Sequence, residues 1–215
     1  MSHFAAILFD FDGVLVDTEM LHATAWNKTL QPHQLSFTES EWRKNYIGRK
    51  DRDFLRELEK AHQHSLSEVQ TQHAIAEKIK TYLALIHERV PVYPHVDATL
   101  AKLFLTHRLS LVTGSNLPEV EHIFALRDWG KYFHPVITAR DVKFGKPDHE
   151  GYLKAVAALK LTPKDCVVVE DSPRGVQAAK NAGIYCIGVT NNYQVQDLPG
   201  ADVCISSLAE LLPLA

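Results

Sequence analysis

The segment ILFDFDGVLVDTE, residues 7–19, joins a short apolar run to a cluster of acidic residues. The apolar run ends at Asp10, which predicts a buried strand because so short a run, bounded by charge, does not suit a helix. Asp10 and Asp12 are two residues apart, so an extended backbone projects both carboxylates to the same side. Gly13 then permits a tight turn. Two acids that project together repel each other, and Mg²⁺, which prefers hard oxygen ligands, would relieve that repulsion.

Three later segments carry polar residues that suit the same site. The apolar run 109–112 ends in Thr113-Gly114-Ser115, and the run 166–169 ends in Glu170-Asp171. Lys146 stands in a Gly-Lys-Pro sequence that opens a predicted helix. In an open parallel sheet, ligands bind outside the carboxyl ends of the strands. We therefore expect two acid pairs, a hydroxyl-bearing loop and one lysine to converge from distant parts of the chain.

The composition is that of an ordinary globular protein. The 215 residues are 46% hydrophobic and 23% charged, which suits one domain with an insertion. A net charge of −3 gives no indication of a nucleic-acid-binding surface. The first apolar run breaks at Asp10 without a basic flank, and no run approaches the ~20 apolar residues of a membrane span, so we expect neither a signal peptide nor a membrane anchor. The three cysteines lie in apolar runs, which favours reduced core thiols and a cytoplasmic protein.

The order of predicted elements indicates an inserted helical block. No strand pattern interrupts residues 18–89, and the longest helical pattern, 67–89, carries Val69, Ile75, Ile79, Leu83 and Ile86. Two prolines end this block, and strands and helices alternate from there to the C-terminus. Such alternation predicts a parallel sheet with right-handed crossovers and helices on both faces. We predict an α/β fold: a Rossmann-like core formed by residues 1–16 and 91–215, with an all-helical domain over residues 17–90.

The acids at this site suit phosphoryl transfer. A carboxylate next to Mg²⁺ can attack phosphorus and form a covalent intermediate, because the cation neutralises the phosphoryl group. Asp10, at the strand end, is the better nucleophile candidate, and Asp12 could protonate the leaving alcohol and later activate water. The expected metal ligands are Asp10, Asp12, Glu170 and Asp171. The phosphoryl oxygens would be bound by Lys146, Thr113, Gly114 and Ser115.

These motifs resemble those of the haloacid dehalogenase-like phosphatases, in the branch that contains phosphoglycolate phosphatases and β-phosphoglucomutases. Four family motifs occur in order over nearly the whole chain: Asp10-Phe-Asp-Gly13, Thr113, Gly145-Lys-Pro147 and Glu170-Asp-Ser172. Four motifs in their expected contexts are highly specific. The resemblance implies that Asp10 is phosphorylated, and that Mg²⁺ is bound by Asp10, the main-chain carbonyl of Asp12, and Glu170 or Asp171. It also implies that the helical insertion is a cap that closes over the site and selects the substrate.

The choice between a phosphatase and a mutase depends on the cap. Thr18 and His22 resemble the Thr and His that help to control the general acid in β-phosphoglucomutases. Those mutases carry an arginine three residues after the cap glycine, and counting from Gly48 places Asp51 at that position. This departure weakens the resemblance to the mutases, although Arg49 and its basic neighbours could substitute for the missing arginine.

We therefore expect Mg²⁺-dependent hydrolysis of a small phosphate monoester, a sugar phosphate or phosphoglycolate, through an aspartyl-phosphate. Asp12 favours this chemistry over dehalogenation, because the dehalogenases of the family lack the second aspartate. A phosphosugar mutase is one alternative, and a non-catalytic binding protein on the same scaffold is another. The expected partner is a small phosphorylated metabolite rather than nucleic acid or membrane, and the expected state is a monomer or weak dimer.

Overall fold

One parallel sheet organises the protein. The computed structural model describes residues 4–87 and 90–214. Six strands lie in the order β3-β2-β1-β4-β5-β6, so the predicted Rossmann-like core is confirmed. Their bounds are β1 Ala6–Phe9, β2 Arg108–Val112, β3 Phe133–Ile137, β4 Cys166–Glu170, β5 Tyr185–Val189 and β6 Val203–Ile205.

Strand β1 lies in the middle of the sheet, between β2 and β4. Phe9, its last residue, is opposite Leu111 of β2 and Val169 of β4, so all three strands end at the same edge. Successive side chains of β1 point to opposite faces. The residue that follows each strand is therefore brought to one edge, and those residues include Asp10 and Thr113.

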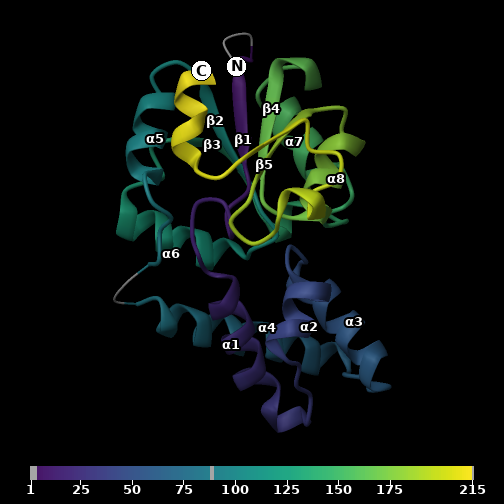
Figure 1. Ribbon diagram of the computed structural model, residues 1–215. Coiled ribbons are helices and arrows are strands. Elements are labelled where there is room, and N and C mark those ends of the chain that lie inside the picture. Colours follow the sequence, from purple (N-terminus) through teal and green to yellow (C-terminus); the bar gives the residue numbers. More distant parts are fainter. Residues whose placement is uncertain (1–3, 88–89, 215) are drawn as a thin grey trace.

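Four core helices cover the two faces of the sheet (Figure 1). On one face, α5 (Val96–Leu103) and α6 (Leu117–Arg127) pack with Ile7 and Phe9 of β1. On the other face, α7 (Glu150–Ala158) and α8 (Pro173–Asn181) pack with Ala6 and Leu8. Because its side chains alternate between the two faces, β1 contributes to two apolar clusters, one on each face.

The insertion after β1 is entirely helical where the structure describes it, and it lies beyond the carboxyl ends of the strands (Figure 1). Its helices are α1 (Glu19–Leu30), α2 (Glu39–Glu41), α3 (Asp51–His62) and α4 (Glu68–Leu85). It has an apolar core of its own that includes Trp26, Phe37, Trp42 and Phe54. The predicted helical cap is therefore confirmed, whereas its exact boundaries at residues 16–17 and 90–91 stay a prediction.

Helix α4 buries a lysine in addition to part of its aliphatic pattern, of which Ile86 is fully buried and Ile75 and Leu83 are partly buried. The predicted helix reaches Arg89, but α4 ends at Leu85, and residues 88–89 lie outside the described part of the chain. The inward residues of α4 are Thr71, Ala74, Lys78 and Tyr82, whereas Val69 is 76% exposed. Lys78 can point inward because two carboxylates compensate its charge.

Two chain segments that run side by side connect the sheet to the cap. The backbone N–H of Asp17 donates to the carbonyl of Pro91 at 2.7 Å, and that of Tyr93 donates to Leu15 at 3.2 Å. His95 follows with φ of 67°, in the left-handed region that favours glycine, and precedes α5. No helix in the described ranges is long and apolar enough to cross a membrane.

Candidate active site

A cavity lies between the carboxyl edge of the sheet and the cap. Each of its walls combines polar residues from segments far apart in the sequence. The core contributes Asp10, Asp12, Thr113, Gly114, Ser115 and Lys146, and the cap contributes Glu19, His22, Trp42, Tyr46, Gly48, Arg49, Asp51 and Lys78. Every expected site residue lines this cavity except Thr18, Glu170 and Asp171. These three lie next to lining residues: Thr18 bonds Asp12, Glu170 contacts Lys146, and Asp171 lies near Asp10.

Three buried carboxylates form a cluster suited to a metal ion. Oxygen atoms of Asp10, Glu170 and Asp171 all lie within 4.8 Å of one another, and none of the three residues is more than 6% exposed. Burial, and then the charge of Glu170, raise the pKa of Asp10 and of Asp171 well above the usual range. These three acids repel one another when they are all ionised. Their cluster is therefore suited to a divalent cation that prefers hard oxygen ligands, such as Mg²⁺.

Lys146 bridges two members of this cluster. Its Nζ lies 2.8 Å from Asp10 Oδ1 and also contacts Glu170 Oε1, which accepts from the Tyr152 hydroxyl at 2.9 Å. The other oxygen, Glu170 Oε2, accepts the backbone N–H groups of Asp171 and Ser172 at 3.0 and 3.1 Å. Burial disfavours the charge of Lys146, but Asp10 and Glu170 raise the pKa of its ammonium, so the cation persists.

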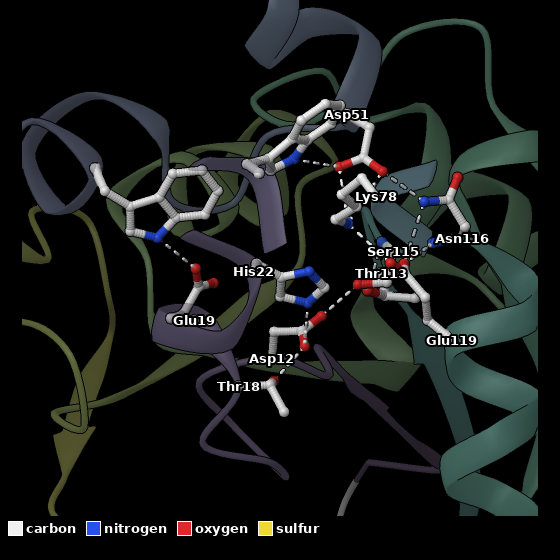
Figure 2. Close-up of polar contacts among 12 residues, drawn as sticks. Asp12, Thr18, Glu19, His22, Asp51, Lys78, Thr113, Ser115, Asn116 and Glu119 are labelled. Atoms are coloured by element: carbon white, nitrogen blue, oxygen red, sulfur yellow. Dashed lines mark hydrogen bonds and ion pairs between the residues drawn. The ribbon is translucent and has the colours of Figure 1, made fainter. Parts of the chain in front are cut away.

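The side chain of Asp12 is not part of the cluster formed by Asp10, Glu170 and Asp171. Its Oδ1 accepts from the Thr18 hydroxyl and lies 3.0 Å from His22 Nε2, while its Oδ2 accepts from the Ser115 hydroxyl (Figure 2). Burial opposes ionisation, but His22 and the two hydroxyls hold the pKa of Asp12 well below its usual range. The side chain of Thr18, at the N-cap position before α1, therefore bonds Asp12 and does not cap the helix.

His22 is fixed between Asp12 and an aromatic ring. It stacks on Tyr82 of α4, with ring centroids 4.1 Å apart and planes 9° apart. Burial and the charge of Lys78 lower its pKa, but Asp12 outweighs them, so the pKa of His22 is raised. The arrangement favours an ionised Asp12 beside a protonated imidazole.

The loop after β2 is held by its own hydrogen bonds. Thr113 Oγ1 accepts the backbone N–H of Ser115 at 3.0 Å, so this N–H, expected to face a phosphate, is already engaged. Asn116 then caps α6, and its backbone N–H donates to Glu119 Oε2 at 2.8 Å. The Ser115 hydroxyl, for which no role was expected, donates to Asp12.

Arg49 is the member of the basic segment 49–52 that lines the cavity. Lys50 Nζ donates to the carbonyl of Val142 at 2.9 Å, and Arg52 pairs with Glu68 at 2.7 Å on the cap surface. Asp51, which takes the place of the mutase arginine, contacts Lys78 Nζ at 3.0 Å. The basic segment therefore offers one cation to the cavity rather than a cluster.

Three functional candidates are absent from the expected set. Glu19 is 5% exposed and accepts from Trp42 Nε1, and its burial, followed by the charge of Asp12, raises its pKa to about 7. Lys78 and Glu119 are also buried and lie 2.8 Å apart. The burial of Lys78 is hinted at in the sequence, because Lys78 has helical spacing from Ala74 and Tyr82. The aliphatic residues of the same helix give a stronger pattern, so the burial of Lys78 was not predicted.

Comparisons with known proteins agree with this geometry. The model of the family described as haloacid dehalogenase-like hydrolase matches residues 7–189. The validoxylamine A 7'-phosphate phosphatase of Streptomyces hygroscopicus subsp. limoneus is 31% identical over 209 residues, which cover 95% of this chain and 94% of the relative. The β-phosphoglucomutase of Bacillus subtilis is 28% identical over 224 residues, 96% of this chain and 91% of the relative. A crystal structure of CbbY from Rhodobacter sphaeroides in complex with phosphate is similar with a TM-score of 0.86 and 26% identity, covering 97% of this chain and 96% of that one.

Proposed function

The chain belongs to the haloacid dehalogenase-like hydrolase family, as its motifs predict, and we propose that it is a Mg²⁺-dependent phosphatase of small phosphate monoesters. The observation that carries this proposal is the position of Asp10. Its carboxylate lies 2.8 Å from Lys146 Nζ and within the cluster formed with Glu170 and Asp171. The proximity of Asp10 to a cation and to a carboxylate cluster suited to a metal ion supports its role as the nucleophile.

The metal would be held by the carboxylates of Asp10 and Asp171, with the main-chain carbonyl of Asp12, and by Glu170 directly or through water. The mutual repulsion of the three buried acids supports this ligand set. When bound, the cation supplies neutralising charge to an incoming phosphoryl group. Lys146 adds a second positive charge beside Asp10, so an anionic nucleophile can approach an anionic substrate.

The two aspartates would divide the reaction between them. Asp10 attacks phosphorus, the bond from phosphorus to the alcohol oxygen breaks, and an aspartyl-phosphate remains on Asp10. The leaving oxygen takes a proton from Asp12, which can first receive one from His22, 3.0 Å away. Asp12, ionised again, then removes a proton from the water that hydrolyses the aspartyl-phosphate. The division therefore depends on a bound cation to ionise Asp10, whose pKa is raised, and on His22 to supply the proton to Asp12, whose pKa is lowered.

The substrate would be a sugar phosphate or a similar hydroxylated monophosphate. The relative that hydrolyses validoxylamine A 7'-phosphate supports this class. On the cap side, Glu19 and Asp51 add carboxylates, whereas the ammonium of Lys78 is already paired with two acids. A single phosphate therefore suits the cavity better than two. We expect the protein to act as a monomer or weak dimer on a small metabolite.

A phosphosugar mutase is the second candidate, favoured by the similarity to a β-phosphoglucomutase and by the contacts of Thr18 and His22 with Asp12. A mutase must return the phosphoryl group to a sugar that carries another phosphate. Asp51, paired with Lys78, leaves Arg49 as the cation available for that second phosphate. This is the reason for which hydrolysis is preferred.

Phosphate release with Mg²⁺ tests the proposal on a panel of sugar phosphates, phosphoglycolate, nucleotides and pyrophosphate, beside a coupled assay for conversion of β-glucose 1-phosphate. We expect hydrolysis that stops with EDTA and falls roughly 10⁴-fold in Asp10→Asn, because an amide cannot replace the nucleophile. Asp128→Asn, on the exposed end of α6, is the matched control and should keep full activity. Undiminished hydrolysis in Asp10→Asn would contradict the nucleophile, and isomerisation without free phosphate would favour the mutase.

A further inference from the structure

Four side chains join the cap to the loop that follows β2. Asp51 and Lys78 belong to the cap, and Asn116 and Glu119 belong to the core (Figure 2). Lys78 Nζ lies 3.0 Å from Asp51 Oδ1 and 2.8 Å from Glu119 Oε1. Asn116 Nδ2 donates to Asp51 Oδ2 at 2.7 Å and to Glu119 Oε2 at 3.1 Å. The four contacts close into one ring that spans both domains, and we refer to these residues as the cap–loop network.

Glu119 divides its two oxygens between the domains. Oε2 accepts the backbone N–H of Asn116 at 2.8 Å, which fixes the end of the loop 113–116. Oε1 accepts from Lys78, which is carried by α4 of the cap. One rigid carboxylate therefore sets both the loop conformation and the position of the cap helix.

The ion pair between Lys78 and Glu119, at the centre of the network, is shielded from solvent. Lys78 is 1% exposed and Glu119 is fully buried. Burial disfavours the charge on Lys78, but Asp51 and Glu119 raise the pKa of its ammonium, so it stays charged. Charge pairs of this kind are strong only while both partners remain in place, because either one alone is a buried uncompensated charge.

We infer that Glu119 is a positioning residue that links closure of the cap to the geometry of the phosphate-binding loop. Movement of the cap away from the core separates Lys78 from Glu119 and Asp51 from Asn116. The loop that leads to Thr113 and Ser115 then loses its partner on the cap side. The inference rests on the proposed phosphatase function, because that function assigns phosphate binding to the loop. The contacts of the cap–loop network do not depend on this assignment.

This linkage predicts a particular kinetic signature. If substrate binds to the closed arrangement, a variant that closes less often has a weaker apparent affinity, reduced by the fraction that is closed. At saturation the substrate itself drives closure, so kcat is retained or rises as product leaves faster. A variant that merely folds badly would instead lose kcat at unchanged KM.

The test uses Glu119→Gln, which keeps an oxygen for the N–H of Asn116 but removes the charge that faces Lys78. We expect KM to rise about 10-fold, within the 5- to 150-fold range typical of linked sites, with kcat within about twofold of wild type. Calorimetric titration with Mg²⁺ and orthophosphate should show a Kd weakened by the same factor. Asp51→Asn should act likewise, and the double variant should be no worse than either single one. Glu68→Gln, which removes an exposed acid of the same helix α4, is the control and should leave KM unchanged.

A fall in kcat at constant KM in Glu119→Gln, or effects that multiply in the double variant, would overturn the linkage. Small-angle X-ray scattering without ligand separates this outcome from failure of the proposed function. If wild type releases no phosphate, the phosphatase proposal fails, but Glu119→Gln should still be more extended than wild type and Glu68→Gln. Equal scattering profiles for all three proteins would overturn the inference whatever the activity.

Discussion

Asp10 and Asp12 are neighbours in sequence with opposite electrostatic surroundings. Burial and the charge of Glu170 raise the pKa of Asp10, although Lys146 opposes them. Burial also acts on Asp12, but His22, Ser115 and Thr18 lower its pKa. A divalent cation would reverse the first situation by favouring the ionised form of Asp10. The pair therefore suits a nucleophile that depends on metal and a base that depends on protein groups.

Glu19 provides a prediction of pH dependence. Its folded pKa of about 7 exceeds the usual 4.5 because of burial and then of the Asp12 charge, so the folded protein holds this proton to higher pH than the unfolded chain. Ionisation of Glu19 therefore lowers the free energy of unfolding between these two pH values, by roughly 3 kcal/mol in total. We expect Glu19→Gln to exceed wild type in stability by up to about that amount near pH 8, and hardly at all near pH 4.5.

Urea unfolding in EDTA at both pH values measures this difference. Glu39→Gln, an exposed acid of α2, is the control and should differ from wild type equally at both. A gain in Glu19→Gln that does not change with pH would mean that the carboxyl of Glu19 is not held protonated by its surroundings.

The junction of β4 and α8 illustrates how one element orients the candidate metal site. Ser172 caps α8 by accepting the N–H of Gly175 at 3.1 Å, and the backbone N–H groups of Asp171 and Ser172 point at Glu170. The start of α8 passes so close to Glu170 that a Cβ on Gly175 would overlap its carboxylate. The helix therefore holds the acid in place on one side while Lys146 holds it on the other.

Gly175→Ala should displace Glu170 from this position. We expect Mg²⁺ affinity to fall about 10- to 100-fold, as when groups that orient metal ligands are lost, and stability to fall by roughly 1–3 kcal/mol. Calorimetric titration with Mg²⁺ and urea unfolding measure the two effects. Gly130→Ala is the matched control, because its Cβ would meet nothing closer than 3.9 Å. Normal Mg²⁺ binding by Gly175→Ala would show that Glu170 need not stay where it lies.

On the scale of the whole molecule, two buried ammonium groups are each paired with carboxylates near the cavity. At the sheet edge Lys146 lies with the three clustered acids, and Lys78 of the cap lies between Asp51 of the cap and Glu119 of the core. The cap has its own apolar core, and Ala25, Tyr82 and Ile86 of its helical region also pack in the apolar cluster of the sheet. Binding of cation and phosphate at the sheet edge would therefore act on the cap through both apolar and polar contacts.

Mg²⁺ should stabilise the whole protein, because it relieves repulsion among acids that the unfolded chain separates. At 100 times its Kd a ligand adds about 2.7 kcal/mol, which for a chain of this size corresponds to a rise in Tm of roughly 5–10 °C. Thermal unfolding with MgCl₂, against NaCl at equal ionic strength, measures the effect. Asp171→Asn should lose most of it, and an equal rise in that variant would place the cation elsewhere.

The sequence by itself determined the fold class and the core of the site. Short apolar runs that end in Asp10, Thr113 and Glu170 are local patterns, and the topology of a parallel sheet brings their ends to one edge. The family follows from the same residues, since each of the four motifs is a short contiguous stretch and can be identified without knowledge of packing.

Only the tertiary structure decided the rest, because it depends on which distant residues become neighbours. Lys78 and Glu119 are 41 residues apart, and nothing local to either one indicates that they form a buried pair. Thr18 stands at the N-cap position of α1, where threonine is common, yet its hydroxyl donates to Asp12. The burial of Lys78 in α4 has the same origin: periodicity ranks residues by their own polarity, whereas burial of Lys78 depends on two carboxylates that other elements supply.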